Sequence, residues 1–267
     1  MKLNSVKIIT FLSLVATVMW VVGLSFTIND QFFNNPPPPV EKSATISTDT
    51  TQTKDVFIVA IGDSLTRGTG DSTGKGYVQY MLNDLKSKTK QNVNLSNLAI
   101  SGYTSQQLIN QLKQTEMQRQ IRQSDIVVMT IGANDLFQGG TTLTNFKQSN
   151  IDALEKTYLS NLKEIYGTIR KINPQTTVYH IGLYNPFIEL SDAKTTSNAV
   201  RKWNFDTADL AATFEKFVFV PTFDLFQLNV NNYLAGDKFH PNSMGYQLVG
   251  DRVASLINFE KENEKNE

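Results

Sequence analysis

The sequence VFIVAIGDSLT, residues 56–66, decides the fold of this chain. Its first six residues form a continuous apolar run, which is typical of a strand buried on both faces of a parallel sheet. The Gly-Asp-Ser that follows is typical of a turn into a helix, where a polar side chain caps the first free N–H groups. The stretch therefore predicts a buried strand that carries Ser64 to the first turn of a helix.

Further stretches have the length and composition of strands, and helical patterns separate them. Strands are expected at residues 93–98, 126–131, 177–181 and 217–220. Helices are expected at residues 77–88, 105–119, 150–172, 193–216 and 243–257. Strands that alternate with helices predict right-handed crossovers and a parallel sheet with helices on both faces. We therefore expect residues 55–258 to form a three-layer α/β/α domain, with a five-stranded parallel sheet in the order 2-1-3-4-5.

The composition excludes several kinds of site and partner. Of the 267 residues, 25 are Lys or Arg and 25 are Asp or Glu, so the formal net charge is zero. No nucleic-acid partner is expected, because such a partner needs a clustered basic excess. The chain has no cysteine, which excludes disulfides, thiolate metal sites, a cysteine nucleophile and a lipid-modified cysteine. Histidine chemistry has two candidates, His180 and His240.

An uncharged apolar run near the N-terminus predicts a transmembrane helix. Residues 8–28 are enough to cross a hydrocarbon core, at a rise of about 1.5 Å per residue. Lys2 and Lys7 precede the run, which predicts a cytoplasmic N-terminus and an extracytoplasmic remainder. A cleaved signal peptide usually has a shorter apolar region that ends in a small-residue cleavage site. We therefore expect residues 1–28 to be a signal anchor that crosses the cell membrane once, with cleavage and secretion as the alternative.

Two polar segments flank the expected domain. Residues 29–54 contain consecutive prolines, Pro36 to Pro39, and then a Ser/Thr-rich patch. The prolines favour an extended polyproline segment, and the Ser/Thr patch has too little apolar surface to pack. We expect a disordered linker that holds the domain off the membrane. Residues 259–267 are expected to form a charged tail.

Four short motifs follow strands at one edge of the expected sheet. Ser64 follows the first strand, and Gly102 follows the second. Asn134 in Gly-Ala-Asn-Asp follows the third strand, and Asp237 and His240 lie in the loop after the fifth. In parallel sheets of this kind, ligands bind outside the carboxyl ends of the strands. The motifs can therefore converge on one site.

These residue types are the parts of an activated serine. A serine becomes a nucleophile when a base takes its proton, and a third group fixes the tautomer of that base. The Asp237 carboxylate can hold one ring nitrogen of His240 as N–H and leave the other free to accept a proton. The backbone N–H groups of Ser64 and Gly102 and the Asn134 amide are candidate oxyanion donors. Each motif alone also fits a helix cap, a loop or a turn, but their order along the sheet favours catalysis.

With these motifs the chain resembles the SGNH (GDSL-type) lipase/acylhydrolase family over about residues 55 to 258. It resembles in particular the membrane-anchored extracytoplasmic members from Gram-positive bacteria. The resemblance implies a flavodoxin-like SGNH hydrolase fold without a metal or organic cofactor. It also implies a catalytic triad of Ser64, His240 and Asp237 and an oxyanion hole of Ser64, Gly102 and Asn134.

The expected activity is that of a serine esterase or acylhydrolase on carboxylic esters, such as those of lipids or lysophospholipids. One alternative is carbohydrate O-acetylesterase activity on a cell-wall polymer, and acyl transfer to an alcohol would use the same residues. An alternative from another class is a non-catalytic surface binding module. The expected partners are a small or polymer-borne ester substrate and, through the N-terminal helix, the membrane. No obligate protein partner is expected.

Several features near the expected site have two interpretations. His180 ends the fourth strand and fits either a pocket wall or a buried structural histidine. The Gly-containing segment at residues 71–76 fits a mobile rim. Core packing is favoured over an acyl pocket for a group of aromatic residues, Phe223, Phe226, Tyr233 and Phe239.

Overall fold

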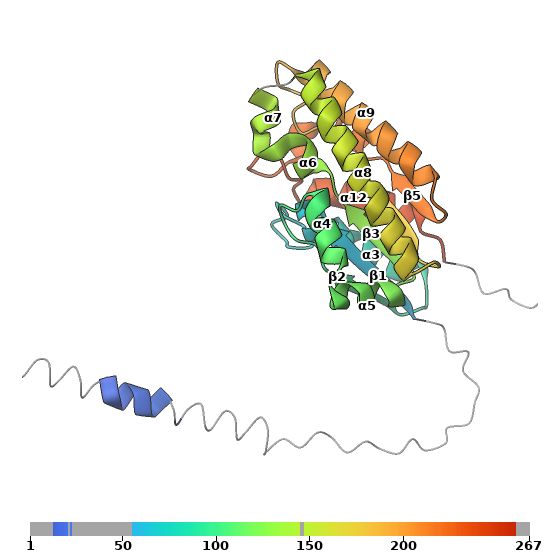
Figure 1. The fold of residues 1–267 in the computed structure, drawn as a ribbon. Coiled ribbons are helices and arrows are strands. Elements are labelled where there is room, and N and C mark those ends of the chain that lie inside the picture. Colours follow the sequence, from blue (N-terminus) through green and yellow to red (C-terminus); the bar gives the residue numbers. More distant parts are fainter. Residues whose placement is uncertain (1–12, 21, 23–54, 145–146, 260–267) are drawn as a thin grey trace, which may run out of the picture. The chain divides into compact units, whose positions relative to one another are not determined.

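The computed structural model describes residues 13–20, 22, 55–144 and 147–259 (Figure 1). The chain divides into two units, residues 1–51 and 52–267. In the first unit residues 13–20 are helical, and no helix among the described residues is long and apolar enough to cross a membrane. The expected span at residues 8–28 extends beyond the described residues, and the expected linker at residues 29–54 lies outside them. The anchor and the linker therefore stay predictions.

A five-stranded parallel sheet forms the centre of the second unit, in the order β2-β1-β3-β4-β5. The expected strands and their order are confirmed. Every residue of β3 is buried, and Phe57 is the one exposed residue of β1. This burial is expected for strands that are covered on both faces. The strands are β1 (Val56–Gly62), β2 (Val93–Asn97), β3 (Ile126–Thr130), β4 (Thr177–Ile181) and β5 (Phe217–Val220).

Helices cover both faces of the sheet (Figure 1). On one face α3 and α12 pack against each other, and their buried side chains form a core with Ile58 and Ala60 of β1. On the other face α4, α5, α8 and α9 form a second core with Val59 and Ile61. Alternate residues of β1 therefore enter different cores, which produces the expected layers. These helices are α3 (Gly76–Lys88), α4 (Ser105–Leu112), α5 (Thr115–Gln123), α8 (Gln148–Ile172), α9 (Ala193–Ala212) and α12 (Ser243–Leu256).

Short helices lie in the loops at the carboxyl ends of the strands, and the sequence predicted only one of them, the helix that begins at Ser64. The helix expected at residues 193–216 also ends early, at Ala212, and Lys216 adopts a φ of 57° just before β5. The short elements are α2 (Ser64–Arg67), α6 (Ala133–Phe137), the 3-10 turn η2 (Gln138–Gly140), α7 (Thr141–Thr144), α10 (Phe223–Phe226) and α11 (Val230–Tyr233).

The prediction of one helix at residues 105–119 is wrong, because the chain breaks between α4 and α5. The backbone is extended at Gln114, with a ψ of 136°. In one continuous helix Met117 would lie roughly 140° around the axis from Leu112, away from the apolar stripe. The break allows both side chains to enter the same buried cluster. Burial of both side chains in the core therefore outweighs the local preference for one continuous helix.

His180 is a buried residue of β4 with a polar partner. It is 1% exposed, and its Nδ1 lies 2.5 Å from the hydroxyl of Tyr166 in α8. Burial lowers the pKa of His180 to about 4, against the opposing effect of the Ile131 backbone. The ring is therefore neutral at neutral pH. These contacts favour the structural interpretation of His180 over the pocket wall.

We expect acid to destabilise the fold through His180. The pKa is about 4 in the folded state against a usual 6.5, so the unfolded chain binds the extra proton between these pH values. This contribution is fully present above the usual pKa and is lost as the pH falls toward the folded value. The loss is roughly 3 kcal/mol, since one pKa unit is worth about 1.4 kcal/mol.

Urea unfolding of the wild-type protein and of His180→Gln, from neutral pH to about pH 4, measures this contribution. The stability advantage of the wild-type protein should shrink by roughly 3 kcal/mol over that range. Other titrating groups, such as Asp63, are present in both proteins and cancel in the comparison. A difference that does not change with pH would contradict the prediction.

Candidate active site

The turn between β1 and α2 fixes the position of Ser64. Gly62 adopts a φ of +116°, and a Cβ there would lie 1.9 Å from the carbonyl oxygen of Thr130 in β3. Glycine alone fits both this conformation and this contact. Asp63 then caps α2, because its Oδ1 accepts the Leu65 N–H at 3.0 Å and the Thr130 hydroxyl at 2.6 Å. Ser64 is thereby held in the first turn of α2, as the sequence predicted.

Asp63 supports this turn from inside the protein. It is fully buried, and its Oδ2 has no hydrogen-bond partner in the described part of the chain. Burial raises the pKa of Asp63 to about 7, against the lowering effect of the Thr130 hydrogen bond. From Thr130 a buried hydrogen-bond chain continues to Thr66 at 2.8 Å and on to Tyr77 at 2.9 Å. Asp63 therefore belongs to the scaffold beneath Ser64.

The loop before α12 places an imidazole against Ser64. His240 Nε2 lies 2.8 Å from Ser64 Oγ, and His240 Nδ1 lies 2.6 Å from Asp237 Oδ2. Because a carboxylate only accepts hydrogen bonds, Nδ1 carries a proton and Nε2 is free to accept one from the serine hydroxyl. The structure thus brings together the three residues that the sequence selected for a triad.

Asp237 is held in its charged form. Partial burial alone would raise the pKa of this carboxyl, but hydrogen bonds from the His240 ring and from two backbone N–H groups outweigh it and lower the pKa. The backbone donors are Phe239 and His240, at 3.0 and 2.9 Å from Asp237 Oδ1. An ionised carboxylate in this position can stabilise an imidazolium at His240.

A buried carboxylate joins the two halves of the site. Asp71 accepts the Ser243 hydroxyl at 2.6 Å and three backbone N–H groups of its own turn at 2.8–3.2 Å. Ser243 begins α12, three residues after His240. The segment at residues 71–76, expected to be a mobile rim, is therefore a hydrogen-bonded turn tied to α12. The bond between Asp71 and Ser243 could not be predicted from the sequence, because the two residues are 172 positions apart.

The loops with the expected oxyanion donors are fastened to each other. Asn134 Nδ2 donates to the Tyr103 carbonyl at 2.9 Å, next to Gly102. The neighbouring Asp135 accepts the Ser105 N–H at 2.9 Å, which orders the same loop as expected. Gly102 is exposed at a φ of +83°, and a Cβ there would meet no atom within 4 Å. A ligand carbonyl can therefore approach its backbone.

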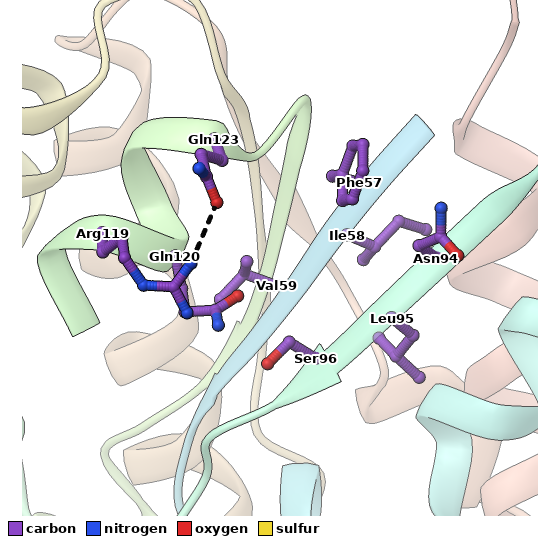
Figure 2. Close-up of a pocket in the computed structure, with 9 residues that line it drawn as sticks. All are labelled: Phe57, Ile58, Val59, Asn94, Leu95, Ser96, Arg119, Gln120 and Gln123. Carbon is purple, nitrogen blue, oxygen red and sulfur yellow. Dashed lines mark hydrogen bonds between the residues drawn. The ribbon is translucent and has the colours of Figure 1, made fainter. Parts of the chain in front are cut away.

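A cavity of about 380 Å³ lies away from these motifs, between α5 and the sheet (Figure 2). Figure 2 shows Phe57 and Val59 of β1 on one side of the cavity and Arg119 and Gln123 of α5 on the other. The Arg119 guanidinium donates a hydrogen bond to Gln123 Oε1 at 3.4 Å. The lining contains no histidine. Phe57 lies near the start of β1, whereas Ser64 follows its end. This cavity is therefore separate from the convergent motifs.

The sequence profile of the GDSL-like Lipase/Acylhydrolase family matches residues 60–248, which is more than half of the chain. The chain belongs to this family. It is an ester hydrolase. The matched range contains all the residues that the sequence selected, namely Ser64, Gly102, Asn134, Asp237 and His240.

Two relatives and a solved structure agree with this family. The uncharacterized protein YpmR of Bacillus subtilis strain 168 is 34% identical over 215 residues, which cover 78% of this chain and 84% of YpmR. The spore germination lipase LipC of Bacillus licheniformis is 26% identical over 202 residues, 73% of this chain and 92% of LipC. The crystal structure of the lipase Lip_vut3 from a goat rumen metagenome has a TM-score of 0.69 at 22% identity, covering 75% of this chain and 96% of that chain. This last likeness shows a shared fold.

Gly62→Ala is expected to destabilise the GDSL hydrolase by about 3 kcal/mol or more, because the new Cβ would strike the Thr130 carbonyl at a positive φ. Gly167→Ala is the matched control, since Gly167 lies in α8 and a Cβ there meets nothing within 4 Å. Alanine in a helix should leave stability unchanged or raise it. Urea unfolding of both variants measures the effect, and equal stabilities would contradict the close approach.

Proposed function

We propose that this GDSL hydrolase is a serine esterase that cleaves carboxylic esters through an acyl-enzyme at Ser64. One observation carries the proposal: Ser64 Oγ, the His240 ring and Asp237 form a continuous line of hydrogen bonds, at 2.8 and 2.6 Å. A hydroxyl nucleophile needs such a base, with its tautomer fixed by a third group. Membership of an ester hydrolase family supports the same assignment.

In the first half of the reaction, His240 Nε2 takes the proton of Ser64 as Oγ attacks the ester carbonyl carbon. Asp237 stabilises the imidazolium that forms. The backbone N–H groups of Ser64 and Gly102 and the Asn134 amide donate to the oxyanion of the tetrahedral intermediate. The imidazolium then gives its proton to the alkoxide oxygen as the C–O bond breaks, and the alcohol leaves.

In the second half, water attacks the acyl carbon on Ser64 while His240 takes a proton from that water. The same donors hold the second oxyanion. The bond between the acyl carbon and Ser64 Oγ then breaks, and the proton on His240 returns to Oγ. The carboxylic acid leaves, and the free enzyme is restored.

Ser64→Ala is expected to lower kcat/KM on a chromogenic ester by roughly 10⁴-fold or more, and His240→Ala by a similar factor, because triad residues act as one unit. Ser87→Ala is the matched control and should keep wild-type activity. Ser87 lies at the exposed end of α3 and donates to the Asp84 carbonyl. Circular dichroism of each variant checks the fold. Wild-type turnover by folded Ser64→Ala would rule out the proposal.

We also propose that residues 1–28 anchor the catalytic domain at the outer face of the cell membrane. The uncharged run at residues 8–28 and the lysines before it, Lys2 and Lys7, support this placement. The polar segment at residues 29–54 would then act as the tether between the membrane and the enzyme.

Expression of the tagged full-length chain in a Gram-positive host tests this placement. The whole chain should sediment with membranes, and protease added to intact protoplasts should remove the catalytic domain. Deletion of residues 1–28 should leave the enzyme in the cytoplasm, since the targeting segment is gone. A shortened chain released into the medium would instead mean that the segment is cleaved as a signal peptide.

A further inference from the structure

Three phenylalanine rings pack against one another beside His240. Phe137, Phe187 and Phe239, here called the aromatic wall, have pairwise ring-centroid distances of 5.1, 5.9 and 6.0 Å. The Phe239 ring also meets the His240 ring edge to face, at 5.0 Å and 88°. The wall therefore borders the imidazole that contacts Ser64.

The wall is not simply a part of the core. Phe137 ends α6, three residues after Asn134, and is 3% exposed. Phe187, in the loop between β4 and α9, and Phe239, next to His240, are only half-buried. Partly exposed aromatic rings beside a reacting centre offer apolar surface that a ligand can cover. Two of the three rings therefore keep surface available at the site.

Hydrogen bonds hold the backbone of the wall in place. The Phe187 N–H donates to Asn185 Oδ1 at 3.0 Å, and the buried Asn185 amide donates in turn to Thr196 and Ser197 of α9 at 3.0 Å. The Tyr184 hydroxyl donates to the Phe239 carbonyl at 2.5 Å. The wall is therefore preorganised, so a ligand does not have to order it.

The other side of Ser64 carries hydroxyl groups. The sheet order places β2 on the opposite side of β1 from β3 and β4. On the β2 side the hydroxyls of Thr69 and Ser101 lie 3.0 Å apart at the surface. Gly70 packs against the Cβ of His240, since a Cβ added at Gly70 would lie 2.8 Å from it. The aromatic wall thus meets the His240 ring, whereas Gly70, which follows Thr69 in the chain, meets the His240 Cβ.

We propose that the aromatic wall binds the acyl chain of the substrate, and that the alcohol part lies over Thr69 and Ser101. The inference rests on the proposed esterase function and names its substrate class. An acetyl group has no chain to cover the wall, whereas each buried methylene strengthens binding about fourfold. The substrate is therefore an ester of a fatty acid longer than acetate with a hydroxylated alcohol, such as a polyol.

The test is the acyl-length dependence of kcat/KM for the full-length protein. The substrates are p-nitrophenyl acetate, butyrate, hexanoate and octanoate, each below its micelle concentration. The wild-type value should rise roughly two- to fourfold per added methylene. Phe187→Ala should lower the octanoate-to-acetate ratio by about tenfold or more, and Phe187→Leu should retain most of it because it keeps apolar surface. A ratio is insensitive to any general loss of active protein.

Phe205→Ala is the matched control, since this α9 ring is 70% exposed and outside the wall. It should leave the ratio unchanged. Ser64-dependent activity that is highest on the acetate ester would overturn the proposed acyl-binding role of the aromatic wall and would leave the esterase proposal intact. If Ser64→Ala hydrolyses every ester as fast as the wild-type protein does, the esterase proposal itself is overturned.

A second series fixes the acyl group as hexanoyl and compares glycerol with an alkyl alcohol as the leaving group. The glycerol ester should be preferred, and Ser101→Val should reduce that preference while keeping the acyl-length dependence. If Phe187→Ala alters the alcohol preference instead of the acyl-length dependence, the proposed orientation of the substrate is wrong.

Discussion

The close approach of Gly62 to β3 is the constraint on which the site depends. The backbone at Gly62 lies against the Thr130 carbonyl and leaves no space for a side chain, so β1 can turn directly into α2. Asp63 then bonds to the hydroxyl of the same Thr130 while it caps α2. The geometry of the turn is therefore set by the neighbouring strand. The sheet therefore holds Ser64 in place, because the Thr130 carbonyl that Gly62 contacts and the Thr130 hydroxyl that Asp63 binds both belong to β3.

The imidazole depends on a second set of long-range contacts. His240 is 176 positions from Ser64. The two residues come together because α12, which begins three residues after His240, packs on α3, the next long helix after Ser64. Asp71 and the Tyr246 hydroxyl, which donates to the Thr69 carbonyl at 2.7 Å, fasten the segment after Ser64 to α12. Helix packing and these bonds position the serine and the imidazole before any substrate binds. Catalysis by preorganised groups requires this.

The sequence predicted the sheet and the convergence of the motifs because both follow from local patterns. Buried parallel strands are continuous apolar runs, and all their carboxyl ends meet at one edge. The role of Asp71 and the break between α4 and α5 were not predictable in this way, since each depends on partners distant in sequence. Phe239 is the clearest case. The sequence favoured core packing for it, and the half-buried ring does pack against the core, but it also meets the His240 ring, which the sequence did not predict.

Two carboxyl groups near Ser64 have opposite environments, and this difference explains which one can partner the imidazole. Asp63 is adjacent in sequence, but it is fully buried, and one of its oxygens has no partner among the residues that the structure describes. Its pKa is raised to about 7. Asp237 has a side chain that is 46% exposed, accepts three hydrogen bonds, and has a lowered pKa. A carboxylate stabilises an imidazolium only when it is ionised. The surface loop therefore supplies the charge that the proposed reaction needs, and the buried turn supplies the rigidity.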